Sequence, residues 1–230
     1  MVVGDGEAVV LWTGGKDSAL ALFEERERGA GIRGLVTFAP PTGEFKAHAP
    51  SLIRAQAESL RLPHRFVAIS PPYAEAYEQA LRELRAGGVR FLITGDISEV
   101  QGHEGWLEGR AKAAGLELVR PLWERGRRAL LERMLEVGLR PVITALRTPV
   151  LPDAWVGRSL DRAAVEELAA LPPDHTIDLC GEGGEYHTMT LGGPGFQRPL
   201  SLGNWTLARE GDLRYARLET SPRSLHRSPD

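Results

Sequence analysis

The stretch that decides the fold reads Val9-Val10-Leu11-Trp12-Thr13-Gly14-Gly15-Lys16-Asp17-Ser18. An apolar run, a pair of glycines and then a helical pattern predict a buried strand, a sharp turn and a helix. Adjacent glycines open backbone angles that other residues avoid, and a helix start presents unpaired N–H groups with about half a positive charge. We therefore predict an anion site, where Lys16 neutralises phosphate oxygens and Ser18 offers its hydroxyl to phosphate or Mg²⁺.

The turn differs from the mononucleotide P-loop, which places a glycine six residues before its lysine, because Val10 occupies that position. A glycine pair before a lysine also occurs in ordinary strand-to-helix turns, but the full motif in this context favours a nucleotide. The motif resembles the Ser-Gly-Gly-Lys-Asp-Ser loop (PP-loop) of the ATP pyrophosphatases, with Thr13 in place of the first serine. That resemblance implies cleavage of ATP between its α and β phosphates.

Composition narrows the class of protein. The chain has 230 residues, a net charge of −3 and a pI near 6.1, so no broad basic face is predicted and nucleic acid is not the expected partner. The single cysteine, Cys180, excludes an intrachain disulfide. The first residues lack the pattern of a signal peptide, and no apolar run reaches the length of a membrane span. We expect a soluble, cytoplasmic protein that does not bind membranes.

Short β-rich runs alternate with helical patterns as far as Trp123, which predicts parallel βαβ units in an α/β fold. The expected strands are Val9–Trp12, Gly34–Phe38, Arg65–Ile69, Phe91–Thr94 and Leu116–Val119. The expected helices are Asp17–Arg28, Pro50–Arg61, Tyr73–Ala86 and Gly105–Ala114.

The pattern changes after Trp123, so we predict one domain over residues 1–124 and a smaller one over 125–220. The second mixes expected helices, Arg128–Val137 and Leu160–Leu171, with β runs at Pro141–Leu146, Ile177–Leu179, Asn204–Arg209 and Leu213–Glu219. The last two runs alternate as a hairpin does. Residues 221–230 are predicted to be a disordered tail.

Ligands of an open parallel sheet lie beyond the carboxyl ends of its strands, so the loops that follow the strands should converge on one crevice. These loops are the glycine turn, Ala39–His48, and the segment that starts at Gly95-Asp96. His48 could contact phosphate or ribose, or be a histidine flanking a helix. Asp96 could hold Mg²⁺ or ribose, or cap the next turn. Asp17 and Asp96 are the predicted Mg²⁺ ligands.

A second dense motif reads Cys180-Gly181-Glu182-Gly183-Gly184-Glu185-Tyr186-His187-Thr188. Its glycines permit an irregular backbone, and Glu182 and Glu185 bring negative charge to one concavity. The pair could bind a cation, hold Mg²⁺, or share a proton as acid and base. A solvated turn would leave the glycines unexplained. Cys180 lacks the partners of a zinc site or an activated nucleophile, so we interpret it as a core residue.

The two motifs together resemble the diphthine-ammonia ligase family over about residues 9–196. The resemblance implies an adenine-nucleotide α-hydrolase-like, Rossmann-type sheet that binds ATP through Thr13, Gly14, Gly15, Lys16, Asp17, Ser18, His48, Gly95 and Asp96. It further implies a mixed α+β substrate domain. The implied reaction adenylates a carboxylate, diphthine on elongation factor 2 where the organism has it, and aminates it with ammonia, releasing AMP and pyrophosphate.

The catalytic residues we expect are Lys16, Asp17, Glu182, Glu185 and His187. We expect Glu182 and Glu185 to face a cationic group or the incoming ammonia, with Tyr186 or a tryptophan offering a ring face. His187 either shuttles a proton or supports the structure.

Two other functions stay open. One is a PP-loop enzyme that acts on another carboxylate or a tRNA base, and the other is a nonenzymatic adenine-nucleotide-binding module. The sequence is also compatible with a homodimer.

Overall fold

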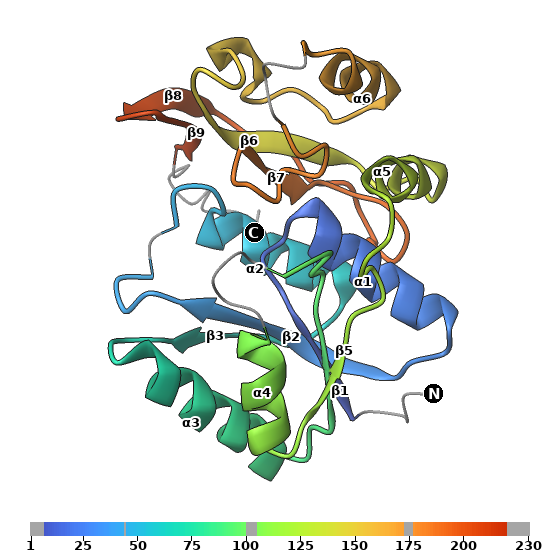
Figure 1. Cartoon of the computed structure of the whole chain (residues 1–230), viewed down its shortest axis with the longest axis vertical. Helices are drawn as coiled ribbons and strands as arrows, with labels where there is room; N and C mark the ends of the chain where they lie inside the picture. The colour runs from blue at the N-terminus through green and yellow to red at the C-terminus, as the bar shows by residue number, and fades with distance from the viewer. Residues whose placement is uncertain (1–6, 44, 100–104, 173–176, 220–230) are drawn as a thin grey trace, which may run out of the picture.

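The computed structural model describes residues 7–43, 45–99, 105–172 and 177–219, which contain two separate sheets (Figure 1). The first sheet is parallel, with the strand order β3-β2-β1-β4-β5, which confirms the predicted α/β class. Its strands are β1 (Ala8–Leu11), β2 (Ile32–Ala39), β3 (His64–Ala68), β4 (Phe91–Ile93) and β5 (Glu117–Val119).

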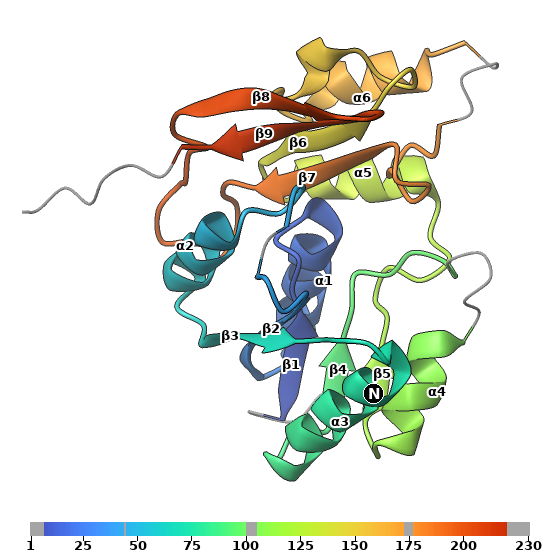
Figure 2. The ribbon, with the colours of Figure 1, turned by 90° about the vertical axis from the view of Figure 1, so that its left-hand side faces the viewer.

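Helices cover both faces of the parallel sheet. α1 (Lys16–Glu27) and α2 (Pro50–Leu60) lie between this sheet and the second one, whereas α3 (Tyr73–Ala86) and α4 (Trp106–Ala113) cover the opposite face (Figures 1 and 2). Adjacent strand residues alternate between the two layers: Val9 packs in the cluster with α3, and Val10 in the cluster with α1. The strands are therefore apolar on both faces, which explains their continuous hydrophobic runs.

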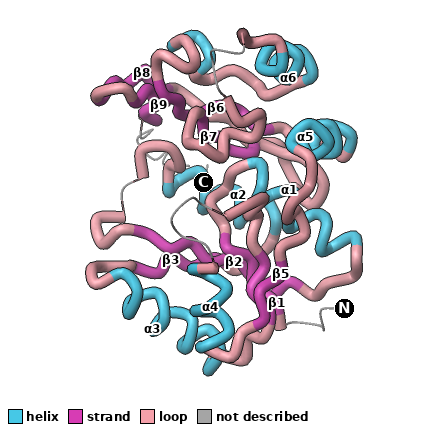
Figure 3. The backbone as a smooth tube through the Cα atoms, viewed as in Figure 1, coloured by secondary structure: helices cyan, strands magenta, loops and turns pink. Residues whose placement is uncertain are grey.

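The second sheet is antiparallel, with the order β7-β6-β9-β8. Its strands are β6 (Pro141–Arg147), β7 (Tyr186–Thr190), β8 (Trp205–Glu210) and β9 (Leu213–Leu218), accompanied by α5 (Arg127–Glu136), a short 3₁₀ helix η1 (Asp153–Trp155) and α6 (Arg162–Ala169). The predicted β8–β9 hairpin is confirmed. Figure 3 shows the residues that connect β7 to β8 as loop.

The strand predicted at Ile177–Leu179 is wrong. Asp178 starts a turn there: its carboxylate accepts the Cys180 N–H (2.7 Å) and its carbonyl accepts the Gly181 N–H (2.8 Å). These local bonds compete with strand pairing, and the strand forms later, as β7. The predicted tail, 221–230, lies outside the described residues.

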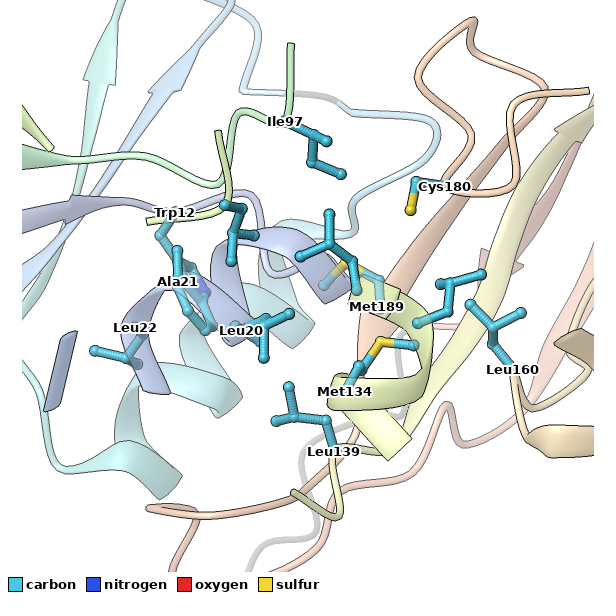
Figure 4. Packing of buried hydrophobic residues seen from close by; sticks show 14 of the residues in the cluster. Trp12, Leu20, Ala21, Leu22, Ile97, Met134, Leu139, Leu160, Cys180 and Met189 are labelled. Atoms are coloured by element: carbon cyan, nitrogen blue, oxygen red, sulfur yellow. The ribbon is translucent and has the colours of Figure 1, made fainter. Parts of the chain in front are cut away.

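One apolar core joins the two sheets. A single cluster of buried side chains runs from Ala8 on β1 through Leu20 on α1 and Met134 on α5 to Ala216 on β9. Figure 4 shows Leu20, Met134, Leu139 and Met189 meeting in this layer. Because α1 packs directly against β7, the loop that precedes α1 lies where the two sheets meet. Among the described residues, no helix is both long and apolar enough to cross a membrane.

Candidate active site

A cavity of about 690 Å³ opens at the carboxyl ends of the parallel strands. Its wall includes Thr13, Asp17 and Ser18 after β1, Phe45 and His48 after β2, and Gly95, Asp96 and Ser98 after β4. The predicted convergence of these three loops is confirmed. Glu182, from the second sequence motif, lines the same cavity, so residues more than 160 positions apart in the chain share one site.

Two glycines are required by close contacts at the start of α1. Gly14 has φ +78°, and a Cβ there would lie 2.3 Å from Oε1 of Gln56. Gly95 packs from the opposite side, where a Cβ would lie 2.6 Å from the backbone nitrogen of Ser18. The turn is thus held against its neighbours, and the N-cap residue of α1, Gly15, has no side chain with which to cap the helix. The local geometry leaves this helix end suited to an anion.

The antiparallel sheet completes the phosphate loop. The backbone N–H of Lys16 donates to Thr188 Oγ1 (3.0 Å), and the N–H of Thr190 donates to the Gly14 carbonyl (2.8 Å). Both threonines lie on β7 and are buried. The conformation of the loop therefore depends on a strand that follows it by more than 160 residues, a dependence that the local sequence pattern could not indicate.

Gln56 is a site residue that sequence reasoning did not assign. Its side chain is fully buried on α2, and its amide nitrogen donates to the carbonyls of Gly14 and Thr190, both at 2.8 Å. Its oxygen accepts the indole N–H of Trp12 at 3.0 Å. The amide is satisfied on every side, so it joins the phosphate loop, α2 and β7. The sequence signal that could have identified Gln56 is its position as a polar residue on the apolar face of a predicted helix.

Lys16 points away from the cavity. Its side chain is 4% exposed, and its ammonium donates to Asp17 Oδ2 (2.7 Å) and to the Cys180 carbonyl. The ammonium also lies over the ring of Tyr186, 5.5 Å from the centroid. Burial acts to lower the pKa of Lys16, but the combined effects of its neighbours, Asp17 first and then Tyr186 and Cys180, raise the pKa above its usual value. The group is therefore a buried cation shared between the two motifs.

Carboxylates gather at the phosphate-loop end of the cavity. Desolvation, and then repulsion from Asp17, raises the pKa of Glu182 to about 7, against the opposing effects of Lys16 and Arg127. Desolvation also raises the pKa of Asp96, with a smaller contribution from Asp17, although Thr94 donates to its carboxylate at 2.9 Å. Glu182 is thus set to exchange a proton near neutral pH.

The donor set fits Mg²⁺. Asp17 and Asp96 line one cavity and repel each other, which a divalent cation would relieve. Within the described ranges, no group of three or more His, Cys, Asp or Glu side chains could hold a metal ion. Mg²⁺ is commonly held by one or two carboxylates together with substrate phosphates, so two aspartates suffice.

Glu182 and Glu185 are separated by the turn. Glu182 lines the cavity, whereas Glu185 accepts the Asp178 N–H through Oε1 (2.8 Å) and leaves Oε2 buried without a hydrogen-bond partner among the described residues. Glu185 is not among the cavity-lining residues, and neither is His187. The two glutamates therefore do not form an acid and base pair facing one concavity.

His48 and His187 pack edge to face, with ring centroids 5.5 Å apart. Nδ1 of His48 lies 3.4 Å from the sulfur of Met189 on β7. Desolvation, followed by repulsion from His187 and Lys16, lowers the pKa of His48 to about 3; desolvation also lowers the pKa of His187. His48 is therefore a neutral ring in the cavity wall at physiological pH.

Aromatic side chains form the far wall of the cavity. Phe38, Tyr77 and Trp106 pack edge to face in series, with centroids 4.8 and 4.7 Å apart. Arg120 stacks on Trp123 at 3.7 Å and pairs with Glu108 (2.7 Å). Trp106 and Trp123 thus line the cavity, each with an arginine stacked on its ring. The other predicted ring, that of Tyr186, does not face the cavity. It is buried under Lys16, and its hydroxyl donates to the Leu179 carbonyl (2.5 Å).

Two family models match the chain: "Diphthamide synthase N-terminal domain" matches residues 6–118, and "Diphthamide synthase C-terminal domain" matches residues 127–217. The chain belongs to the diphthamide synthase family. The matched ranges contain both the phosphate loop and the motif from Cys180 to Thr188.

Curated relatives carry a consistent name. "Diphthine--ammonia ligase" from Mus musculus is 25% identical over 83% of this chain and 80% of its own length. Proteins of the same name from Bos taurus (32%, over 41% of this chain) and Danio rerio (30%, over 45% of this chain) are matched over 35% and 44% of their own lengths. The chain thus spans less than half the length of these two relatives.

A solved structure described as a predicted subunit of a tRNA methyltransferase from Methanocaldococcus jannaschii covers 81% of this chain and 97% of its own. It aligns with a TM-score of 0.43 at 15% identity.

Proposed function

We propose that the protein is an ATP-dependent, AMP-forming ligase that converts a substrate carboxylate to an amide. The observation that carries this proposal is that the phosphate loop and Glu182 open into the same cavity. One end of the cavity can receive the phosphates of ATP, and the other end is large and aromatic enough to receive an acceptor. The relatives named diphthine--ammonia ligase support diphthine on elongation factor 2 as that acceptor, in organisms that have it.

The proposed first step is attack of an acceptor carboxylate oxygen on the α phosphorus of ATP. The bond between that phosphorus and the bridging oxygen breaks, so pyrophosphate leaves and an acyl-adenylate forms. The backbone N–H groups of Asp17 and Ser18 at the start of α1, together with the hydroxyls of Thr13 and Ser18, would hold the departing pyrophosphate. Gly14, with φ +78°, lets the backbone make the turn that brings these groups to the cavity.

Asp17 and Asp96 are the residues that would hold Mg²⁺. The ion supplies charge neutralisation for the phosphates of ATP when it is bound. Without such neutralisation, the carboxylates of this end of the cavity would repel the phosphates, since Lys16, Arg120 and Arg127 already bind carboxylates of the protein.

The proposed second step is attack of ammonia on the acyl carbon, which releases AMP. The nitrogen loses a proton as the amide forms, and Glu182 is the group in the cavity wall that can accept it near neutral pH. His48 lines the wall as a neutral ring that suits the base or ribose of the nucleotide. Glu185 and His187 support the turn and β7 behind the cavity in this proposal.

The test is to incubate the protein with Mg-ATP, ammonium and elongation factor 2 carrying diphthine. The nucleotide products and the mass of the factor are followed together. We expect AMP, together with the mass change for replacement of a hydroxyl by an amino group. ADP as the product would contradict the proposal, and ATP binding without turnover would favour a nucleotide-binding module.

A matched pair of variants localises the activity. Asp17→Asn should reduce the rate by about a hundredfold or more, because it removes one of two proposed Mg²⁺ ligands. Glu27→Gln removes an exposed carboxylate at the other end of the same helix and should leave the rate unchanged. Equal rates for the two variants would remove Asp17 from the mechanism.

A further inference from the structure

We propose that Lys16 is a positioning residue that ties the phosphate loop to the turn carrying Glu182, and that it does not bind the phosphates of the nucleotide. This inference rests on the proposed function, and it changes the role that the sequence motif suggests for the lysine. It follows from where the ammonium lies, which groups it contacts, and what those contacts hold in place.

Two of the three donors of the Lys16 ammonium are engaged within the protein, and the ammonium lies over an aromatic ring. It donates to Asp17 Oδ2 at 2.7 Å and to the Cys180 carbonyl, and its remaining side faces the ring of Tyr186. Asp17 and Ser18 line the cavity. Lys16, which comes directly before them, is not among the residues that line it. An ammonium has three donors: Asp17 and the Cys180 carbonyl accept two of them, and the third lies on the side of the Tyr186 ring.

The partners of Lys16 are themselves held firmly. Tyr186 is 2% exposed and its hydroxyl donates to the Leu179 carbonyl, next to the Cys180 carbonyl that Lys16 binds. Asp178, which begins the same turn, receives Arg127 Nε at 2.8 Å. Apart from Asp17, the partners in the network that the lysine closes all belong to the C-terminal half of the chain.

The position of Glu182 depends on this network. Glu182 follows Cys180 by two residues, across Gly181, whose φ of +76° makes the turn sharp. Loss of the contact between Lys16 and the Cys180 carbonyl would free the turn to move relative to Asp17. We expect the Lys16 side chain to act through Glu182 on the acceptor half of the reaction, while the backbone of the loop still binds the phosphates.

The experiment compares Lys16→Met with the wild-type protein, and uses Lys112→Met, an exposed lysine on α4, as the control. Calorimetry gives the Kd for Mg-ATP, and hydrogen exchange of the free protein gives the protection of amides 178–188. We expect exchange in this segment to rise about tenfold or more in Lys16→Met and the Kd to stay within about threefold. Unchanged exchange, or a Kd weakened about tenfold or more, would overturn the proposal.

A second measurement uses the wild-type protein and does not require the variant to fold. The chain has only three lysines, Lys16, Lys46 and Lys112, so labelling by an amine-acylating reagent is readily assigned by mass spectrometry. We expect Lys16 to remain unlabelled with and without Mg-ATP, while the two exposed lysines react. Labelling of Lys16 in the free protein that Mg-ATP prevents would overturn the proposal.

Both measurements are made without an acceptor. A protein that binds Mg-ATP but forms no amide would contradict the proposed function, and the exchange and labelling results would still decide the role of Lys16.

Discussion

At the scale of single residues, the cavity is defined by groups whose protonation differs from that of the free side chains. Glu182 carries a carboxyl that titrates near neutral pH, and His48 carries an imidazole that stays neutral. Both effects come first from desolvation by neighbouring protein, and only then from nearby charges. Each therefore predicts a measurable dependence of stability on pH.

The partly buried His48 should destabilise the folded protein in acid. Its pKa in the folded state is about 3, below that of an unfolded histidine, so the unfolded state binds the proton first. Stability is complete above about pH 6.5 and falls as the pH drops towards 3. His48→Gln removes this loss. Between pH 7.5 and pH 5, chemical denaturation should show that the free energy of unfolding falls by about 1 kcal/mol more in the wild type than in the variant. Equal decreases in the two proteins would contradict a lowered pKa for His48.

Glu182 should have the opposite pH dependence. Its folded pKa of about 7 lies above the unfolded value, so the folded state prefers the protonated form and stability is lost as the pH rises from about 4.5 to 7. In metal-free buffer at pH 8, Glu182→Gln should be more stable than the wild type by about 1 kcal/mol, after allowance for screening by solvent in the cavity. At pH 4 the two should be equal. Glu117→Gln, at an exposed position on β5, controls for the loss of one carboxylate. A difference in stability between Glu182→Gln and the wild type that stays the same from pH 4 to pH 8 would contradict the raised pKa of Glu182.

At the scale of elements, the turn between β1 and α1 is restricted by its neighbours as well as by its own backbone. Gly14→Ala would place a methyl group in contact with Gln56 and Met189, at a φ of +78°. We expect a loss of about 2–4 kcal/mol in the free energy of unfolding, together with weaker binding of Mg-ATP.

Gly29→Ala is the matched control for Gly14→Ala. Gly29 ends the same helix with φ +84°, but no atom lies within 4 Å of the Cβ position. The control should lose only about 1 kcal/mol, the cost of a left-handed backbone for alanine. Equal losses in the two variants, measured by denaturation, would show that the contacts of Gly14 contribute nothing.

The elements could be predicted from the sequence where local patterns decide them. Val9–Leu11 is apolar on both faces and the two glycines begin three residues after it, so β1, the turn and α1 could be predicted. The strand β7 was not, because the prediction placed a strand at Ile177–Leu179, where the Asp178 carboxylate favours a turn. Whether Glu182 or Glu185 faces the cavity depends on that turn, and hence on contacts with Lys16 and Arg127 that no local pattern reveals.

At the scale of the whole molecule, the two sheets share one core, and the phosphate loop lies at their junction. The change of pattern after Trp123 led us to predict two domains, and that division stays a prediction. The bonds from Thr188 and Thr190 to the loop were beyond such reasoning, because they depend on how the sheets pack. The site exists only when both halves are folded and joined.

The shared core predicts that the molecule unfolds as one unit. Met134 on α5 is 1% exposed and packs in the cluster that joins the sheets, whereas Leu84 on α3 packs beneath the parallel sheet alone. Met134→Ala and Leu84→Ala should each lower the free energy of unfolding by about 2–5 kcal/mol. In both variants, the hydrogen-exchange rates of the amides on β4 and on β8 should rise together. Separate transitions for the two sheets would contradict a common core.

The most direct measurement is the exchange of labelled pyrophosphate into ATP, in the presence of the acceptor protein and Mg²⁺ but without ammonia. An enzyme that forms an acyl-adenylate reversibly will return label to ATP only when the acceptor carboxylate is present. We predict acceptor-dependent exchange, which Asp17→Asn abolishes and Glu27→Gln preserves. Formation of the amide without any such exchange, or with ADP and phosphate as products, would contradict cleavage of ATP between its α and β phosphates at this site.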